Sequence, residues 1–195
     1  MQNLNVIHPL FHYLPELGEE FPIFEQRISA LARGMQLELN HYEIDHLALR
    51  VNNLQRSKIW LTAFLKCGKI LSDNMVNGRV IYLIQLVEPL VFLGQKIDII
   101  ELPLPKNKQY PQQTWEHIEV VMPFLPNEST EQWLQRIENQ FLWGELSSLA
   151  VKVSVPKVVG ELFPNPSVAV SLKEQSNNHT TIKVHPFNIK KVIEV

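Results

Sequence analysis

The sequence predicts an α+β protein built from two paired βαβββ modules, whose strands form one cupped mixed sheet, preceded by a helical extension. Two segments, Asp45–Val51 and Trp115–Val121, each contain an acid followed by a histidine and continue as an apolar strand. Helical and strand patterns follow both segments in the same order, and a polar linker ending in proline separates the two runs. The predicted parts are an N-terminal extension (1–40), a first module (41–105), a linker (106–114) and a second module (115–195), the two modules forming one compact domain.

The N-terminal extension is expected to be helical. Residues 1–17 are rich in aromatic side chains and interrupted by prolines, which suits a short helical arm packed on the modules. Residues 20–35 place apolar side chains three and four positions apart, which predicts an amphipathic helix. Gly34 lies near the end of this pattern, where a glycine often stops a helix.

In the first module, a strand that ends at two asparagines is followed by a helix with one apolar face. Gly68 suits the C-cap of that helix, and the Asn77-Gly78 pair is the strongest short signal for a β-hairpin. Prolines stop the last strand. The expected elements are a strand at 44–51, a helix at 54–67 and strands at 69–75, 80–87 and 97–102.

The second module repeats this order. Asn127 is the expected N-cap of its helix, and turns at 162–166 and 176–178 separate its later strands. Asn188 suits the cap of a short terminal helix. The expected elements are a strand at 115–122, a helix at 128–141, strands at 150–155, 167–172 and 179–185, and a helix at 189–194.

Composition narrows the classes of function. The chain has 195 residues, of which 45% are hydrophobic and 19% charged, so a proper core can form. A net charge of −2 argues against nucleic acid or an anionic membrane as a partner. The single cysteine, Cys67, excludes an intrachain disulfide and fits a reducing compartment. No signal-peptide or membrane-span pattern is found, so we expect a cytoplasmic protein.

The strongest functional signal is a set of four candidate metal ligands. Each module has a histidine on its first strand and a metal-competent side chain on its last strand, giving His46 with Glu101 and His117 with His185. Because strand side chains alternate between faces, all four can line the concave side of the sheet while apolar neighbours pack under the helices. One such histidine is usually structural, but the matched placement in both modules predicts a shared metal site.

Three imidazoles and a carboxylate suit a divalent Zn, Ni, Co, Fe or Mn ion, and the lack of a thiolate argues against a structural zinc clip. Two further residues would face the same cavity. Arg50 is expected either to bind a substrate carboxylate or phosphate or to pair with Glu119. Glu119 is expected to act as a general base, or to pair with Arg50 or Lys183.

Asp45 and Glu116 precede the two first-strand histidines, so alternation predicts that both point away from the cavity as surface or capping groups.

The βαβββ repeat with these ligands resembles the vicinal oxygen chelate superfamily, which includes glyoxalase I and extradiol dioxygenases. More closely, the chain resembles the bacterial YecM family of candidate metal-binding proteins. The resemblance implies a paired fold and a shared metal site whose ligands match His46, Glu101, His117 and His185. The superfamily usually has a glutamate where His185 stands, and His179 is the alternative if the last strand is displaced. The matching segments are 45–50, 74–79, 101–105, 110–120, 162–170 and 180–186.

Three functions are compatible with these observations. The first is a metal-dependent isomerase, lyase or dioxygenase acting on a small molecule with two neighbouring oxygens. The second is a module that binds or sequesters a metal and a small ligand without reaction. The third is a duplicated fold in which the histidines have only a structural role. The sequence names neither the metal nor the substrate, and it indicates no oligomeric state.

Overall fold

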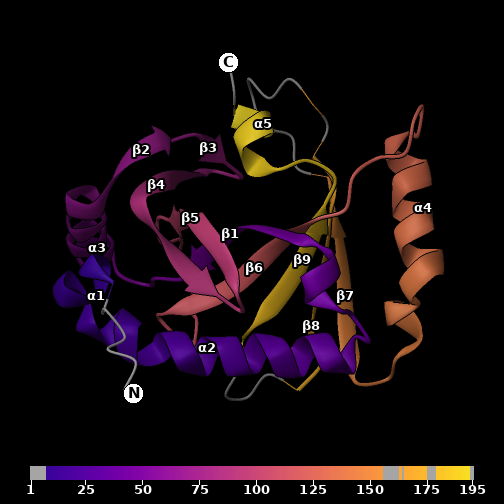
Figure 1. The fold of residues 1–195 in the computed structure, drawn as a ribbon, viewed down its shortest axis with the longest axis horizontal. Coiled ribbons are helices and arrows are strands. Elements are labelled where there is room, and N and C mark those ends of the chain that lie inside the picture. Colours follow the sequence, from indigo (N-terminus) through magenta and orange to yellow (C-terminus); the bar gives the residue numbers. More distant parts are fainter. Residues whose placement is uncertain (1–7, 156–162, 164, 175–178, 194–195) are drawn as a thin grey trace.

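The structure, a computed structural model, describes residues 8–155, 163, 165–174 and 179–193 (Figure 1). The turn predicted at 176–178 and two residues of the turn predicted at 162–166, residues 162 and 164, lie outside these residues. The strands are β1 (Glu43–Leu49), β2 (Gly68–Ser72), β3 (Met75–Val76), β4 (Arg79–Phe92), β5 (Gln95–Pro103), β6 (Trp115–Val121), β7 (Leu149–Ser154), β8 (Ser167–Leu172) and β9 (Thr181–His185). The helices are α1 (Pro9–Tyr13), α2 (Pro15–Gly34), α3 (Leu54–Cys67), α4 (Thr130–Phe141) and α5 (Ile189–Ile193), with 3₁₀ turns η1 (Leu39–His41) and η2 (Trp143–Glu145).

One open mixed sheet connects the two halves of the chain, in the order β2-β4-β5-β1-β6-β9-β8-β7, with β3 paired to β4 alone. The order is symmetric about its centre, where β1 and β6 are antiparallel. Each central strand has a parallel neighbour from its own half, β5 beside β1 and β9 beside β6. The predicted α+β fold of two paired βαβββ modules behind N-terminal helices is therefore confirmed, and the residue limits given for each part stay predictions.

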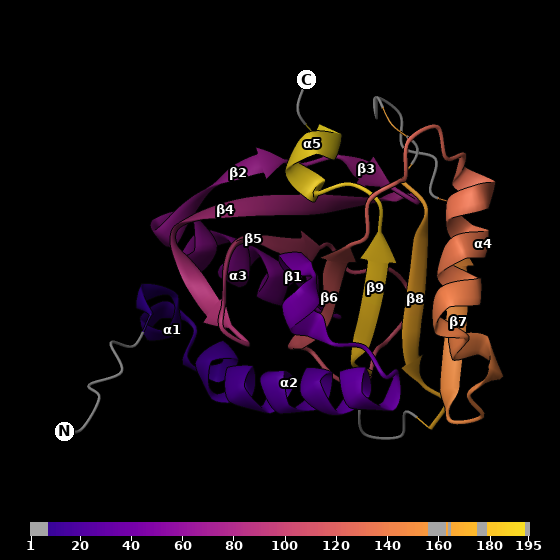
Figure 2. The same ribbon diagram turned by 45° about the vertical axis from the view of Figure 1, so that its right-hand side comes forward.

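Helices α2 and α3 cover one side of this sheet, whereas α5 lies on the other side (Figures 1 and 2). Helix α2 packs across β6 and β9, and α3 packs on β2 and β4. The indole Nε1 of Trp115 donates a hydrogen bond to the carbonyl of Leu17 at 2.9 Å, which ties β6 to α2. Phe21 and Phe24 contact the same indole ring. The aromatic N-terminal segment thus fastens the central strands from their outer side.

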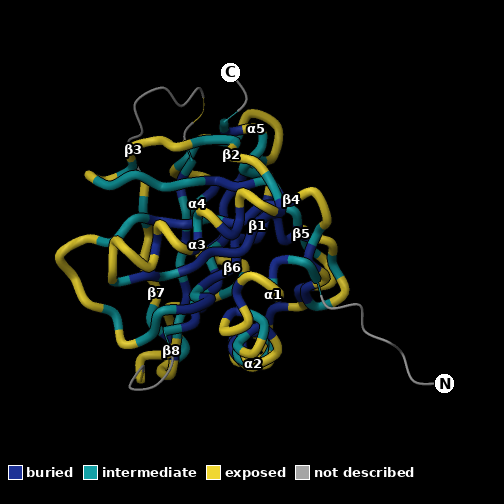
Figure 3. The backbone as a smooth tube through the Cα atoms, turned by 90° about the vertical axis from the view of Figure 1, so that its left-hand side faces the viewer, coloured by how far each residue is buried: buried dark blue, intermediate teal, exposed yellow. Residues whose placement is uncertain are grey.

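Alternation along the central strands separates an apolar face from a polar one, as predicted. Leu47 and Leu49 of β1 lie in the hydrophobic core with Ile118 and Val120 of β6. The histidines of the same strands, His46 and His117, are buried but point to the other face. Figure 3 shows that β1 and β6 are buried along most of their length.

The pairing of β1 with β6 contains two irregularities that alternation does not anticipate. Ile44 pairs with Val120 and His46 with Glu119, so Asp45 is an extra residue on β1. Ala48 pairs with His117 and Leu49 with Trp115, so Glu116 is an extra residue on β6. A bulge of this kind re-aims the side chain that it inserts. Each of the two acid–histidine pairs therefore contains a bulged acid, and the two bulges are reciprocal.

Other differences from the prediction are local. The N-cap of α4 is Ser129, which forms a capping box with Gln132, and not Asn127, which has a φ of 64° in the preceding turn. The Asn77-Gly78 hairpin is confirmed, with φ of 49° and 78° at its two residues, as a type I′ turn requires. None of the described helices is long and apolar enough to cross a membrane.

Candidate metal centre

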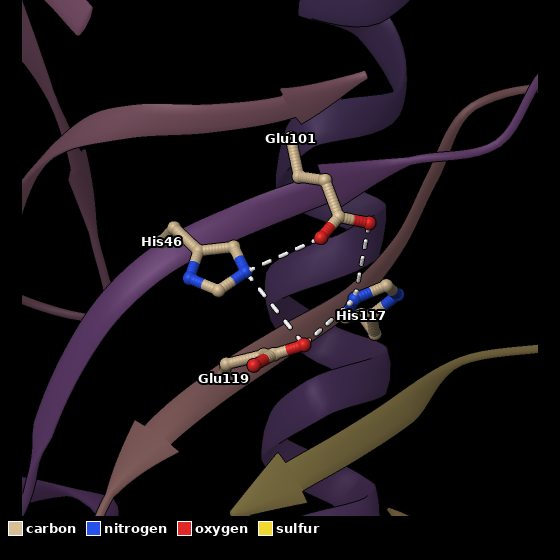
Figure 4. Close-up of side chains that lie close together, drawn as sticks. All are labelled: His46, Glu101, His117 and Glu119. Atoms are coloured by element: carbon tan, nitrogen blue, oxygen red, sulfur yellow. Dashed lines mark ion pairs between the residues drawn. The ribbon is translucent and has the colours of Figure 1, made fainter. Parts of the chain in front are cut away.

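Four side chains from three strands converge on one point at the centre of the sheet (Figure 4). They are His46 of β1, Glu101 of β5, and His117 and Glu119 of β6. The Nε2 atom of His46 lies 3.7 Å from Glu101 Oε2 and 3.7 Å from Glu119 Oε1. The Nε2 atom of His117 lies 3.9 Å from Glu101 Oε1 and 3.5 Å from Glu119 Oε1.

These spacings suit ligands of one small cation. An ion about 2.1 Å from four tetrahedral ligand atoms keeps those atoms about 3.4 Å apart. The group is also almost closed to solvent, since the side chains of His46 and His117 are 0% and 1% exposed and those of Glu101 and Glu119 are 13% and 10% exposed. His46 Nε2 is buried without a hydrogen-bond partner among the described residues. A bound cation would give this nitrogen the partner that the protein does not.

The two acids at the bulges hold the other nitrogen of each ring. Asp45 Oδ1 lies 2.9 Å from His46 Nδ1, and Glu116 Oε2 lies 2.9 Å from His117 Nδ1. A carboxylate at Nδ1 fixes the tautomer and aims the Nε2 lone pair at the metal, as acids behind histidine ligands do in many metal sites. The expectation that Asp45 and Glu116 point away was wrong. The signal that could have found their role is the repeated acid–histidine dipeptide itself.

His185, the fourth predicted ligand, lies outside the group of four. It belongs to a second group with Asp45 and His46, in which each residue offers an atom within 4.8 Å of the others. Its Nε2 lies 3.0 Å from Asp45 Oδ2 and its Nδ1 lies 3.3 Å from Glu119 Oε2. His185 therefore connects Asp45, the acid that holds the His46 ring, to Oε2 of Glu119, the oxygen directed away from the ligand group.

Lys183 is the residue that corresponds to Glu101 by register. Glu101 pairs with Ala48, two residues after His46, and Lys183 pairs with Glu119, two residues after His117. Its Nζ donates to His117 Nε2 at 2.9 Å and to Glu119 Oε1 at 3.2 Å. The ammonium of Lys183 thus occupies the space between His117 Nε2 and Glu119 Oε1. A metal bound to these two atoms requires Lys183 to move toward the adjoining cavity.

The electrostatics keep the carboxylates ionised. Burial alone would raise the pKa of Asp45, but the charges and hydrogen bonds of His46 and His185 lower it to about 2. Burial likewise opposes ionisation of Glu101, whose pKa is lowered to about 2 by the nearby imidazole of His46 and by the charges of His117 and Lys183.

Two other groups respond to the same charges. Burial disfavours the charged form of His46, yet Asp45 and Glu119 hold its pKa well above its usual value. The pKa of Lys183 is also raised, because Glu119 and Glu101 outweigh the effect of its burial. The metal-free cluster thus attracts cations of either kind, protons or metal ions.

Arg50 lines a cavity of about 200 Å³ that opens directly over the two ligand carboxylates. It pairs with Glu116 and not with Glu119, and its guanidinium stacks 4.5 Å from the ring centre of Tyr110. Its Nε and Nη1 atoms are buried without a hydrogen-bond partner among the described residues. Both halves contribute to the cavity, which is also lined by Arg79, Leu83, Asn165, Lys183 and Ile189.

Comparisons with known proteins agree with the resemblance to the YecM family. A protein of Haemophilus influenzae, named only as uncharacterized, is 58% identical over 180 residues, which are 92% of this chain and 93% of that protein. Protein YecM of Escherichia coli is 35% identical over 180 residues, or 92% of each chain. A solved structure titled "Structural Genomics, Protein EC4020" superposes with a TM-score of 0.78 at 31% identity, covering 98% of both chains. The family model described as YecM protein matches residues 14–195, and the chain therefore belongs to the YecM family.

Proposed function

We propose that this protein binds one divalent metal ion between its two halves, with His46, Glu101, His117 and Glu119 as ligands. The observation that carries the proposal is the buried Nε2 of His46, which has no described hydrogen-bond partner and lies 3.7 Å from both carboxylates. Imidazole nitrogens and carboxylate oxygens suit Zn, Ni, Co, Fe or Mn. Four protein ligands leave coordination positions for a substrate in any ion that takes five or six.

We further propose that the metal serves a small molecule bound in the cavity. Two βαβββ halves paired about central strands that carry the ligands are the arrangement of the vicinal oxygen chelate superfamily, which supports isomerase, lyase or dioxygenase chemistry. The metal would supply Lewis acidity toward two neighbouring oxygens of the substrate. The protein would orient that substrate with Arg50 and exclude water from it with the apolar side chains of Leu83 and Ile189. Such a protein would work in the cytoplasm.

A second candidate is a module that binds a metal and a small ligand without turnover. One observation favours it, because Glu101 and Glu119 are the only carboxylates among the described residues that line the cavity. Both belong to the ligand group, so neither is free as a general base while it holds a metal. In the enzymatic alternative, Glu119 would have to move protons through the oxygen that His185 contacts. Product analysis by mass spectrometry separates the two candidates.

The test of the metal site is elemental analysis of protein purified without added metal, followed by titration with each divalent ion. We expect about one ion per chain, and loss of that ion in His46→Gln and His117→Gln. The matched control is His41→Gln, because the His41 side chain is exposed and belongs to neither group of candidate ligands. Wild-type protein that binds none of these ions would refute the proposal, as would variants that keep the metal.

A further inference from the structure

The cavity above the ligand group has a chemical character of its own. Its volume of about 200 Å³ equals that of about seven water molecules. An organic acid of a few carbon atoms fits this space. Glu101 and Glu119 form its floor, and its walls carry three cationic side chains, Arg50, Arg79 and Lys183.

Among the three cationic side chains of the cavity, Arg79 is the one for which the described part of the chain provides no ion pair. It begins β4 directly after the Asn77-Gly78 turn and is half-buried at the cavity wall. Its guanidinium forms no ion pair with any described carboxylate. Burial lowers the pKa of Arg79, and the positive charge of Arg50 lowers it further. Two guanidiniums therefore share one cavity, and only that of Arg50 has a carboxylate partner, Glu116.

Lys183 adds a second available cation once a metal is bound. Its ammonium donates to His117 Nε2 and Glu119 Oε1. A metal needs the same two atoms. The single lone pair of His117 Nε2 cannot accept a hydrogen bond from the ammonium and bind a metal at the same time. Lys183 must then turn from the metal and into the cavity that it already lines.

The metal-loaded cavity therefore carries more positive than negative charge. The ion and three cationic side chains outweigh Glu101, Glu119 and the Arg50 partner Glu116. Unbalanced charge away from water is unfavourable unless a counter-charge arrives. A hydrogen-bond acceptor is available as well, since the amide Oδ1 of Asn165 is buried without a partner among the described residues and lines the cavity.

We propose that the cavity binds a small organic acid, which places oxygens on the metal and a carboxylate between Arg79 and Lys183. This inference rests on the proposed metal site and names the class of molecule that the site receives. A guanidinium holds a carboxylate through two parallel hydrogen bonds, which explains an arginine at this wall. A neutral molecule of the same size would meet the metal but leave both cations unpaired.

The test uses full-length protein whose Zn²⁺ content has first been measured. Calorimetric titration compares 2-oxoglutarate and oxalate with pentane-2,3-dione, a neutral molecule that also has neighbouring oxygens. We expect the acids to bind at least about tenfold more tightly than the dione. Arg79→Gln should weaken 2-oxoglutarate binding about 10- to 100-fold and leave dione binding unchanged. Arg79→Lys should keep part of the preference, and Arg56→Gln on the exposed face of α3 should keep all of it.

Lys183→Gln gives a signature that a merely structural role would not. Loss of the competing ammonium should raise Zn²⁺ affinity, while loss of the cationic wall should lower 2-oxoglutarate affinity. Equal binding of acids and dione, or an Arg79→Gln variant with wild-type preference, would overturn the inference. If Zn²⁺-loaded protein binds neither acid, only the inference fails. If the wild-type protein binds no Zn²⁺ or other divalent ion, the proposed metal site fails with it.

Discussion

At the scale of single residues, each ligand histidine has its two nitrogens committed to different tasks. Asp45 and Glu116 occupy Nδ1 of His46 and His117, so both Nε2 lone pairs point into the site. The two acids differ in their outer partners. Asp45 also accepts a hydrogen bond from the backbone N–H of Ile189 at 2.6 Å, whereas Glu116 pairs with Arg50. The first acid therefore links the site to the C-terminal helix, and the second links it to the cavity wall.

Asp45→Asn should keep the shape of the side chain while weakening its hold on the His46 ring. We expect metal affinity to fall about 10- to 100-fold, the usual effect of changing an acid behind a histidine ligand. Competition with a chelator of known affinity measures the change. Asp73→Asn, at an exposed position, is the matched control. An unchanged affinity in Asp45→Asn would show that this acid does not position the ligand.

His185→Gln separates a ligand from a positioning residue. His185 contacts Glu119 Oε2, the oxygen directed away from the ligand group, so the metal should still bind but less tightly. Titration should show about one ion per chain in this variant and none in His46→Gln. Equal loss of metal in both variants would instead make His185 a ligand, as the sequence pattern predicted.

At the scale of the element, the alternation of strand side chains predicted the core residues correctly, but it predicted the wrong direction for the side chains of Asp45 and Glu116. Leu47 and Val120 fall on the apolar face and His46 and His117 on the polar face, because a two-residue period follows from strand geometry alone. The bulges at Asp45 and Glu116 break that period locally. Neither position carries a glycine or proline that would indicate a bulge, so nothing in the local sequence announces it.

Register was the second feature that the sequence did not contain. Similar spacing in the two halves suggested that His185 corresponds to Glu101, since chain length between strands is all that a sequence offers. Strand pairing shows that Lys183 is the equivalent residue, two positions earlier. Loops of different length in the two halves change the number of residues between the first and last strands, but they do not change how those strands pair. His46, Glu101 and His117 could be predicted because they lie on strands recognised by their own patterns.

Substitution of Gly68, where α3 passes into β2, tests how closely the edge strand β2 packs against β4. A Cβ at this position would lie 2.2 Å from the backbone oxygen of Gln85 on β4. Gly68→Ala should therefore lower the free energy of unfolding by about 1–3 kcal/mol. Gly34→Ala, where a Cβ would meet no described atom within 4 Å, should be neutral or stabilise by up to about 1 kcal/mol. Urea unfolding measures both, and equal stability of the two variants would contradict the close approach.

At the scale of the whole molecule, the site joins the two halves of the sheet. His46 and Glu101 come from the first half, and His117 and Glu119 come from the second. A metal held by all four residues bridges β1, β5 and β6, so it binds the folded chain and not the unfolded one. Binding of this kind stabilises the fold by mass action, by about 2.7 kcal/mol at a free metal concentration 100 times the dissociation constant.

The stability of the metal-free protein depends on pH through the shifted pKa values. In metal-free protein, Asp45, Glu101 and Glu116 have pKa values of about 2, so their contribution is present above their unfolded values near 4 and is lost as pH falls toward 2. The pKa values of His46 and His185 are raised, so their contribution is complete below about 6.5 and is lost as pH rises through the raised values. Metal-free protein should thus be most stable on the acid side of neutrality.

Metal binding has the opposite dependence, because the metal and a proton compete for Nε2 of His46. The melting temperature with Zn²⁺ should exceed that with chelator by a margin that grows as pH rises from 6 toward the raised pKa of His46. Calorimetry at matched ionic strength measures this margin, and His46→Gln should abolish it. A margin that is constant or shrinks with rising pH would mean that His46 Nε2 gives up no proton to the metal, and so is not a ligand.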